Sequence, residues 1–445
     1  MLKKKAILKK LLIGTLISTM IFSGCGASKS KESTENKGNG TTEKKELKGE
    51  ISFSTWGSLE EKKVNEEIIK LFEAKYPGTK VKLQYIPEEY TTKIDTLFLG
   101  KQAPDVIYGH PKYFTKWASQ GLLMDLTDRF KSSPELMDDS KFETSLYDAF
   151  KYDGKNIATI NGADTMVIYY NKDLFDAAGV EYPNEKWTWE QFAEAAKKLT
   201  IKGEDGKPKQ YGVSVDGGYS LAETFMFSNG GQWFDDMNNP KEVRFNSKEN
   251  VEALQMMQDL IFKHKAAPTS SDSQVLGGGF DAGKIAMNID GVWSVVYRKD
   301  IKDFKWGIAE VPTVPNKEKR IPALYAGYSL SKDTKNPDLA WEFAKFMQSD
   351  EAQKLLAKSG LITVINKQIA NSDEVLNIPG APDNHKVRVT TLKKAIHNDA
   401  VMVNWDEALT KTFTPNMDLL LTNKQSAEET AKKIHEGMEE MLKNK

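Results

Sequence analysis

Hydrophobic positions change their period several times along the chain after residue 50. Ile51, Phe53 and Thr55 alternate with polar neighbours as in a short strand, and a capping box at 58–61 opens a helical pattern that Pro77-Gly78 ends. Alternation returns at 81–85, a helical stretch covers 88–101, and a β-rich run follows at 106–108. Strand, helix, strand, helix, strand predicts an α/β layer fold with a mainly parallel sheet.

The rest of the chain carries similar signals. The β-rich run MVIYY at 166–170 predicts another strand, and helix starts follow at Thr188, Asn336-Pro337, Ser349 and Ser426. No repeat of 20–50 residues is present. The number of α/β units fits two lobes of similar size better than one closed barrel.

The first 25 residues have the pattern of a secretory signal. Five lysines precede a twelve-residue apolar run at 11–22, which is too short for a stable membrane span. The run ends in Ser23-Gly24-Cys25, which resembles the lipobox of bacterial lipoproteins, although Phe22 departs from the usual aliphatic residue. The resemblance implies cleavage after residue 24 and a lipid on Cys25. The alternative is an ordinary secretory signal with an incidental cysteine.

Residues 25–48 then predict a flexible tether. After Cys25, only Ala27 and Leu47 are apolar, so the segment cannot bury enough surface to fold. Cleavage would remove five lysines and no acid, which takes the net charge from −1 to −6. A lipid at Cys25 would hold the globular part at the extracellular face of the cytoplasmic membrane. The lysine bias and the anchor fit a Gram-positive cell.

Composition excludes several classes of partner and site. The chain has 62 basic and 63 acidic residues, whereas nucleic-acid-binding domains are usually basic. One cysteine excludes an internal disulfide framework and a thiolate zinc cluster, and the five histidines lack metal-ligand spacing. We therefore expect no metal, no cofactor and no nucleic acid.

Three signals typical of enzymes or iron sites are weak. The stretch GGFDAGK at 278–284 has the spacing of a phosphate-binding loop, but the following Ile285 lacks the hydroxyl that would hold magnesium. Tandem Tyr169-Tyr170 lies within an apolar run, which favours core tyrosines over a ferric site. Carboxylate pairs for glycoside hydrolysis stay open, because 63 acidic residues will place some pair in any cleft.

Large aromatic residues lie beside glycine-containing turns at several places. In an open α/β sheet, ligands bind beyond the carboxyl ends of the strands, where exposed rings would suit the C–H faces of sugars. Packing within a lobe is the alternative for each ring taken singly. The aromatic residues that stand out in this way are Trp56, Tyr108, Tyr113, Trp233, Trp293, Tyr325, Tyr328 and Trp405.

An ordered series of motifs between about residues 50 and 410 resembles the extracellular solute-binding proteins of ABC importers, in the group that includes maltose-binding protein. The series is APDVIYG at 103–109, GLLMDLTD at 121–128, YYNKDLFDAAGV at 169–180, TWEQFAEAAKKLT at 188–200, SNGGQW at 228–233, FDAGKIAMNIDGVW at 280–293 and NPDLAWEFAKFM at 336–347. None of these stretches is diagnostic alone, but their order together with the lipobox is specific.

The resemblance implies a two-lobed periplasmic-binding-protein-like fold of class α/β, with a ligand cleft between the lobes and a crossover hinge. Crossings are expected near 160–165, 326–329 and 367–370. Lobe 1 would then comprise 50–163 and 328–367, and lobe 2 would comprise 164–327 and 368–445.

By position in the family's pattern, ligand contacts are expected from both lobes. Trp56, Tyr90, Asp105, the segment from Tyr108 to Tyr113, and Asp164 would approach from lobe 1 and the first crossing, and Trp233, Trp293, Tyr325 and Trp405 from lobe 2. Asp105 and Asp164 could accept hydrogen bonds from sugar hydroxyls. Maltose-binding protein has an acid–base pair where this chain has Pro111 and Lys112, so maltose is not carried over as the ligand.

The resemblance implies a monomeric, non-enzymatic protein that binds a mono- or oligosaccharide and delivers it to an ABC permease by hinge closure. Two alternatives stay open. One is a surface-anchored glycoside hydrolase or lyase, and the other is a binding protein for a non-sugar ligand such as a polyamine, a phosphonate or ferric ion.

Overall fold

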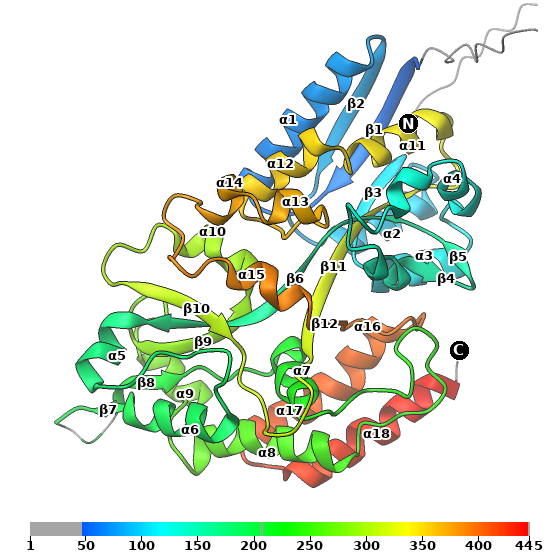
Figure 1. Cartoon of the computed structure of the whole chain (residues 1–445). Coiled ribbons are helices and arrows are strands. Elements are labelled where there is room, and N and C mark those ends of the chain that lie inside the picture. The colour runs from blue at the N-terminus through cyan, green and yellow to red at the C-terminus, as the bar shows by residue number, and fades with distance from the viewer. Residues whose placement is uncertain (1–46, 205, 207, 444–445) are drawn as a thin grey trace, which may run out of the picture. The chain divides into compact units, whose positions relative to one another are not determined.

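The computed structural model describes residues 47–204, 206 and 208–443. The predicted signal segment, Cys25 and all but the last two residues of the predicted tether lie outside these residues. Within the compact unit Leu47–Lys445, the chain begins with three parallel strands joined by helices, as the alternating periods predict. These elements are β1 (Gly49–Thr55), α1 (Leu59–Lys75), β2 (Thr79–Tyr85), α2 (Tyr90–Leu99) and β3 (Val106–Gly109) (Figure 1).

Local sequence explains where α1 begins. The Ser58 hydroxyl accepts a hydrogen bond from the backbone N–H of Glu61, and the Glu61 carboxylate accepts one from the N–H of Ser58. This capping box satisfies two backbone donors that the first turn of a helix leaves free. Ile68, Ile69 and Phe72 on one face of α1 then pack into the core beneath the strands.

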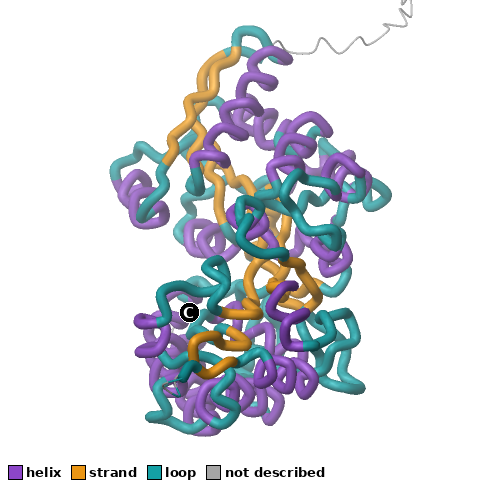
Figure 2. The backbone as a smooth tube through the Cα atoms, turned by 90° about the vertical axis from the view of Figure 1, so that its left-hand side faces the viewer, coloured by secondary structure: helices purple, strands orange, loops and turns teal. Residues whose placement is uncertain are grey.

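Two long strands link this first part of the fold to the second. They are β6 (Thr159–Asn171) and β11 (Ile321–Leu330). The main sheet has the order β2-β1-β3-β11-β6-β9-β8-β7, with β10 also paired to β6 and β12 to β11. The strands not yet introduced are β7 (Ile201–Lys202), β8 (Pro208–Val213), β9 (Ile285–Gly291), β10 (Trp306–Glu310) and β12 (Ala395–His397). Figure 2 shows this continuous path of strands in orange with helices around it.

The sheet is mixed, whereas the periodicity predicted a mainly parallel one. β1 pairs parallel with β2 and β3, and β8 with β9, but β11 runs antiparallel to both β3 and β6. The reason is the connectivity. β6 and β11 are joined through a whole lobe and not through a single crossover helix. The expectation that strands joined by one helix run parallel therefore does not apply to them.

Buried side chains of the described residues form two large cores and a small third cluster. The first core draws its members from 51–163 and 323–389, and the second from 166–321 and 400–438. The third lies on the other face of the second sheet region, because alternation along β6 sends Val167 and Tyr169 there and Ile168 and Tyr170 to the second core. Both tyrosines are buried, as their apolar run predicts.

Core membership assigns 47–163 and 323–389 to lobe 1, and 166–321 and 400–443 to lobe 2. The first change of core falls within the expected crossing at 160–165. The second falls between Ile321 and Ala323, a few residues before the expected one. The third falls after Val389 and not near 367–370, because Ile369 and Val375 pack into the first core.

The remaining elements surround these strands. Lobe 1 adds α3 (Pro111–Ser119), α4 (Thr127–Lys131), η1 (Pro134–Met137), η2 (Thr144–Phe150), β4 (Lys151–Tyr152), β5 (Lys155–Asn156), α11 (Pro337–Phe346), α12 (Asp350–Ser359), α13 (Lys367–Ala370), α14 (Asp373–Leu376) and α15 (Val387–Leu392). Lobe 2 adds α5 (Lys172–Ala178), α6 (Trp189–Lys198), β7 (Ile201–Lys202), β8 (Pro208–Val213), α7 (Tyr219–Ser228), α8 (Lys248–Phe262), α9 (Ser270–Val275), β9 (Ile285–Gly291), η3 (Val292–Ser294), α10 (Val295–Arg298), β10 (Trp306–Glu310), α16 (Trp405–Ala408), η4 (Leu409–Phe413), α17 (Thr414–Leu421) and α18 (Ala427–Lys443). The short strand β12 (Ala395–His397) lies between the two sets along the chain.

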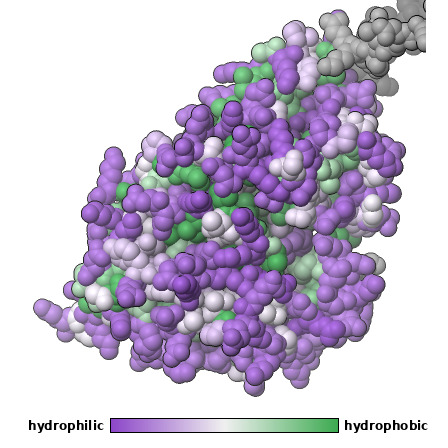
Figure 3. All heavy atoms as spheres, in the orientation of Figure 1, coloured by the Kyte–Doolittle hydropathy of each residue, from purple (hydrophilic) through white to green (hydrophobic). Residues whose placement is uncertain are grey.

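Hydrophobic residues are unevenly distributed over the surface (Figure 3). On the face drawn in Figure 3, hydrophobic residues gather in the middle, where α10, α13 and α15 lie, and most of the remaining face is hydrophilic. No helix within the described ranges has the length and apolar character that a membrane span requires.

Glycine permits a close approach of β6 to β11 at Gly327. A Cβ on Gly327 would lie 2.1 Å from the carbonyl oxygen of Thr159 and 2.9 Å from the ring of Phe150. The register of the two strands also shifts between Ala326 and Gly327, which leaves Asn161 unpaired as a bulge. The backbones therefore meet at a point where no side chain fits.

We expect Gly327→Ala to destabilise the protein, because overpacking of this kind costs about 1–3 kcal/mol. Unfolding in urea, followed by circular dichroism, should show a lower midpoint than in wild type. Gly279→Ala is the matched control, since no atom lies within 4 Å of its Cβ position. Equal midpoints for the two variants would contradict the close packing described above.

Candidate functional site

A cavity of about 500 Å³ opens where the two lobes meet the strands that join them. Lobe 1 supplies one wall, β6 and β11 supply the floor, and η3 and α10 of lobe 2 supply the other wall. The lining residues are Trp56, Gly57, Ser58, Glu61, Pro87, Tyr108, His110, Asp164, Trp293, Tyr297, Leu324, Ala326, Leu361 and Ile362. A molecule held here would contact both lobes and the hinge strands.

The lobe 1 wall is an aromatic cluster centred on Trp56, which follows β1. Its ring lies 4.8 Å from Tyr90, 4.4 Å from Tyr108 and 5.1 Å from His110 between centroids. The Tyr90 hydroxyl donates to the carbonyl oxygen of Tyr108 at 2.8 Å, which ties α2 to β3 beneath the rings. The cluster gives the cavity a flat apolar surface with polar edges, which suits the C–H face of a sugar ring.

The opposite wall carries Trp293 and Tyr297. Trp293 packs flat against the backbone at Gly291, where a Cβ would come within 2.1 Å of the indole ring. Tyr297 is 57% exposed in the structure, so its ring has surface free to contact a ligand. Rings thus face the cavity from both lobes.

Asp164 on β6 provides the most buried polar group of the floor, with 4% of its surface exposed. Its Oδ1 accepts hydrogen bonds from the backbone N–H of Thr363 at 2.9 Å and from the Thr363 hydroxyl at 2.8 Å. Burial raises the pKa of Asp164, and the nearby Arg388 guanidinium opposes that rise. The carboxylate is therefore oriented by lobe 1 while it sits on a hinge strand.

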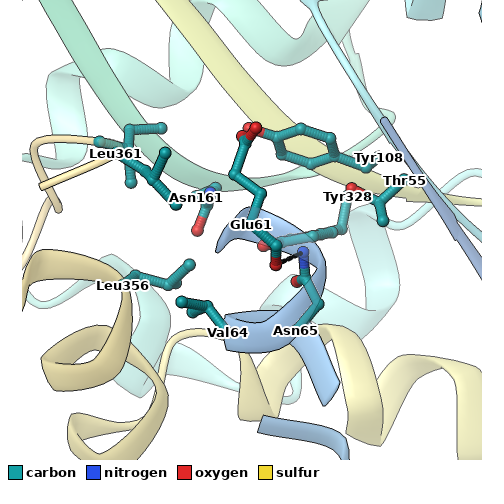
Figure 4. A pocket seen from close by; sticks show the side chains of 10 residues that line it. Thr55, Glu61, Val64, Asn65, Tyr108, Asn161, Tyr328, Leu356 and Leu361 are labelled. Atoms are coloured by element: carbon teal, nitrogen blue, oxygen red, sulfur yellow. Dashed lines mark hydrogen bonds between the residues drawn. The ribbon is translucent and has the colours of Figure 1, made fainter. Parts of the chain in front are cut away.

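Glu61 is a second carboxylate on the cavity wall. Its Oε2 accepts from the Ser58 N–H at 2.6 Å in the capping box of α1. Burial raises the pKa of Glu61, and the negative charge of Asp164 adds to the rise. A void of about 20 Å³, the size of one water molecule, shares Glu61, Tyr108, Leu361 and Ile362 with the cavity (Figure 4).

His110 contributes a neutral ring. Its Nδ1 lies 2.6 Å from the carbonyl oxygen of Tyr325, which can only accept, so Nδ1 carries the proton and Nε2 is an acceptor. Burial lowers the pKa of His110. With Glu61 and Asp164, the cavity therefore presents several acceptors for hydroxyl groups, and no lysine or arginine of the described ranges lines it.

The structure brings four of the ten predicted ligand contacts to this cavity, namely Trp56, Tyr108, Asp164 and Trp293. Tyr90 lies directly behind them, 7% exposed, in contact with Trp56. Glu61 and Tyr297 were not predicted, and His110 was expected only as part of the segment from Tyr108 to Tyr113. Glu61 had a complete local explanation as a capping residue, and Tyr297 lies beside no glycine turn.

The other predicted contacts have structural partners elsewhere. Asp105 bonds to the hydroxyls of Ser52 and Thr334, which joins β1 to the segment after β11. Trp233 and Trp405 are fully buried in the second core, where their rings pack at 5.0 Å and a right angle.

A buried acid explains the position of Trp233. Its Nε1–H donates to the Glu223 carboxylate at 2.6 Å, and burial raises the pKa of Glu223 well above its usual range. We therefore assign Trp233 and Trp405 to lobe packing and remove them, with Asp105, from the candidate site.

Tyr325 faces away from the cavity, because alternation along β11 sends Leu324 and Ala326 to one face and Tyr325 to the other. A second cavity of about 390 Å³ lies on that other face, and Tyr325 lines it together with residues of both lobes. Its ring stacks on His397 with centroids 5.1 Å apart. The two cavities are thus separated by the hinge strands.

Tyr113 lies beside an ion pair that bridges the lobes. Lys112 on α3 of lobe 1 contacts Asp406 of lobe 2 at 3.0 Å, and its Nζ lies over the rings of Tyr113 and Tyr219 at 5.1 and 5.4 Å. Burial opposes the charge of Lys112, but the neighbouring Asp399, Tyr113 and Asp406 raise its pKa overall. Lys112, one of the two residues that stand where maltose-binding protein has its acid–base pair, thus forms a contact between the lobes.

Comparison with known proteins supports a common ancestry. Residues 56–354 match a family model described as bacterial extracellular solute-binding protein. The arabinooligosaccharide-binding protein of Bacillus subtilis is 26% identical over 360 residues, which cover 78% of this chain and 77% of that protein.

Solved structures agree with this match. An ABC substrate-binding protein from Listeria monocytogenes in complex with cycloalternan superposes with a TM-score of 0.78 at 29% identity, covering 89% of this chain and all of that one. The GacH receptor of Streptomyces glaucescens, at 23% identity and a TM-score of 0.74 over 90% of this chain and all of that one, shares the fold.

Removing the Lys112 charge should loosen the contact between the lobes. We expect Lys112→Met to increase the radius of gyration of the ligand-free protein, measured by small-angle X-ray scattering, because Asp406 and Tyr219 lose their partner from lobe 1. Lys116→Met is the control, since Lys116 on the same helix pairs with Asp95 inside lobe 1 at 2.7 Å. A K112M protein as compact as K116M would show that the ion pair does not hold the lobes.

Proposed function

The chain belongs to the bacterial extracellular solute-binding protein family, and we propose that it captures a carbohydrate outside the cell and delivers it to an ABC import permease. Proteins of this family bind solutes and do not transform them, so the hydrolase and lyase alternatives lose their support. The ligand would be a mono- or oligosaccharide. ATP hydrolysis would belong to another subunit of the importer, inside the cell.

The cavity lined by both lobes carries this proposal. Trp56 and Trp293 offer ring faces from opposite walls, and Asp164 and Glu61 offer acceptors for pairs of hydroxyls. A ligand that touches both walls favours the closed arrangement of the lobes, because only that arrangement makes both sets of contacts. The permease would then recognise the liganded form by surfaces on both lobes.

Relatives point to the same class of ligand. The Bacillus subtilis relative is named for arabino-oligosaccharides, and the Listeria monocytogenes structure holds cycloalternan. A ferric site with tyrosine ligands finds no support, because Tyr169 and Tyr170 are core residues outside the cavity. A polyamine remains the alternative that the two cavity carboxylates could serve.

We further propose that the protein is a monomer anchored by a lipid on Cys25 to the cytoplasmic membrane of a Gram-positive cell. The lipobox-like Ser23-Gly24-Cys25 and the polar segment after it support this part of the proposal. The tether would let the lobes reach the permease from an anchored position.

Thermal unfolding against a panel of compounds tests the ligand class. Arabinotriose, maltotriose or cycloalternan should raise the midpoint, since a ligand at a hundredfold excess over Kd adds about 2.7 kcal/mol of stability. Trp56→Ala should weaken binding of the responding saccharide about tenfold or more by loss of ring stacking. Tyr182→Ala, at an exposed aromatic outside the cavity, is the control.

Several outcomes would contradict the ligand class. A shift with spermidine or ferric citrate and with no saccharide would replace carbohydrate by that ligand. Cleavage of a saccharide during incubation would restore the enzyme alternative. A W56A protein that binds the responding saccharide as wild type does would remove the cavity from the proposal.

The anchor is tested in cells. We expect wild-type protein in the membrane fraction with a lipid-modified N-terminal cysteine by mass spectrometry, and Cys25→Ser to abolish the modification and the normal processing. Ser23→Thr keeps the cysteine and a small residue, so it should remain lipid-modified. An unmodified wild-type protein released into the medium would favour an ordinary secretory signal.

A further inference from the structure

Asp164 is joined to a buried arginine by a relay of hydrogen bonds. Arg388 Nε donates to the Thr363 hydroxyl oxygen at 3.0 Å, and that hydroxyl donates to Asp164 Oδ1 at 2.8 Å. Arg388 Nη2 also lies 3.8 Å from the same carboxylate oxygen. The charge of Arg388 is thereby directed at Oδ1 both through space and through Thr363.

Arg388 itself does not reach the ligand cavity. It is 1% exposed, does not line the cavity, and projects from α15, which packs on β6. Nη2 donates to the carbonyl oxygen of Gly360 at 3.3 Å, and Nη1 donates to His385 Nε2 at 3.2 Å. A second tie, 2.6 Å between the hydroxyls of Thr165 and Thr391, holds α15 against β6 beside Asp164.

All of these contacts use one oxygen of Asp164. No hydrogen bond from the described residues reaches Oδ2, and the side chain lines the cavity. A buried carboxylate without a cation takes up a proton, which would turn one oxygen into a donor and remove its charge. Whether Oδ2 is a charged acceptor therefore depends on Thr363 and Arg388, which interact with Oδ1.

We propose that Arg388 is a positioning residue for ligand binding, which acts through Thr363 to aim Asp164 Oδ2 into the cavity and to keep this carboxylate ionised. The inference rests on the proposed function, because it takes a ligand with hydroxyl groups to occupy the cavity. Arg388 lies on α15 of lobe 1, shortly before the third change of core. Ligand contact at Asp164 is therefore coupled to α15 as well as to β6.

Other titratable groups face the same region and must be separated from Asp164. Glu61 and His110 line the cavity, the hydroxyls of Tyr108 and Tyr169 lie close enough for the charge of Asp164 to raise their pKa values, and His385 contacts Arg388. The pKa of His385 is lowered to about 3 by burial and by Arg388, so it stays neutral above pH 5. Glu61→Gln in each variant removes the remaining carboxylate of the cavity.

The test is the pH profile of affinity for arabinotriose and cycloalternan between pH 5 and pH 8. In Arg388→Met the pKa of Asp164 should rise further, so affinity should be lost as the pH falls, beginning at least one unit higher than in wild type. At pH 6 we expect Kd to be about tenfold weaker than in wild type. Arg129→Met, at a half-buried arginine of lobe 1 that pairs with Asp338 away from the cavity, should keep the wild-type profile.

A double-mutant cycle shows whether Arg388 acts through Asp164. Asp164→Asn should weaken binding at all these pH values, and adding R388M to D164N should leave Kd unchanged. If R388M does not fold, Thr363→Val removes the relay while it keeps the charge, and its affinity should be lost at a higher pH than in wild type. A wild-type profile in R388M or T363V, or an equal loss from R388M in the D164N background, would overturn the proposal.

Unfolding in urea without ligand separates failure of this inference from failure of the proposed function. The R388M–D164N coupling in the free energy of unfolding should be larger at pH 8 than at pH 5. In the single variant R388M, Asp164 is buried without its cation, and a carboxyl group with a raised pKa destabilises the fold as the pH rises. If neither saccharide binds wild type, this coupling decides the role of Arg388. The absence of coupling would overturn it.

Discussion

The antiparallel pairing of β6 with β11 is the contact on which both lobes and the cavity depend. Each strand has one end in the first core and the other in the second, so their register sets how the two cores are aligned along the hinge. Asp164 stands opposite Leu324 in that register, and both line the cavity. The bulge at Asn161 and the bare backbone at Gly327 let the strands approach closely. The floor of the site is thus built from the same hydrogen bonds that join the lobes.

Much of the fold could be predicted where the signal is local. The capping boxes at Ser58 and Thr188 mark the starts of α1 and α6, alternation marks β1 and β2, and a β-rich run marks β3. The third passage between the lobes was expected too early in the chain, because α13 and α14 have four residues each and carry no periodicity long enough to show which core they join. The mixed sheet could not be predicted either, since the direction of β11 depends on connections of more than a hundred residues.

The site was predicted in part, and the limit has a physical cause. The same pattern, an aromatic ring beside a glycine turn, is found at Trp56 and Trp293 on the cavity and at Trp233 in the core. Only the residues that each ring contacts in the folded protein distinguish them. For Trp233 that partner is Glu223, a buried carboxylate that no local pattern singles out. Glu61 shows the converse error, in which a residue of the cavity is missed. Its role as a helix cap explained its presence, but the same side chain also lines the cavity. Arg388 lies more than two hundred residues from Asp164 along the chain, so their contact belongs to tertiary structure alone.

The position of β11 in the sheet has a consequence for how the protein must be made. β3 forms its antiparallel edge with β11, whose residues are synthesised roughly two hundred positions later. Until they emerge, β3 has an open edge and the first core lacks β11 and α11, so neither lobe can close while the chain is incomplete. Such long sequence separation slows folding and leaves apolar surface open to aggregation. The same delay keeps the unfinished chain unfolded. A protein that is exported across a membrane before it folds must stay in this state until export.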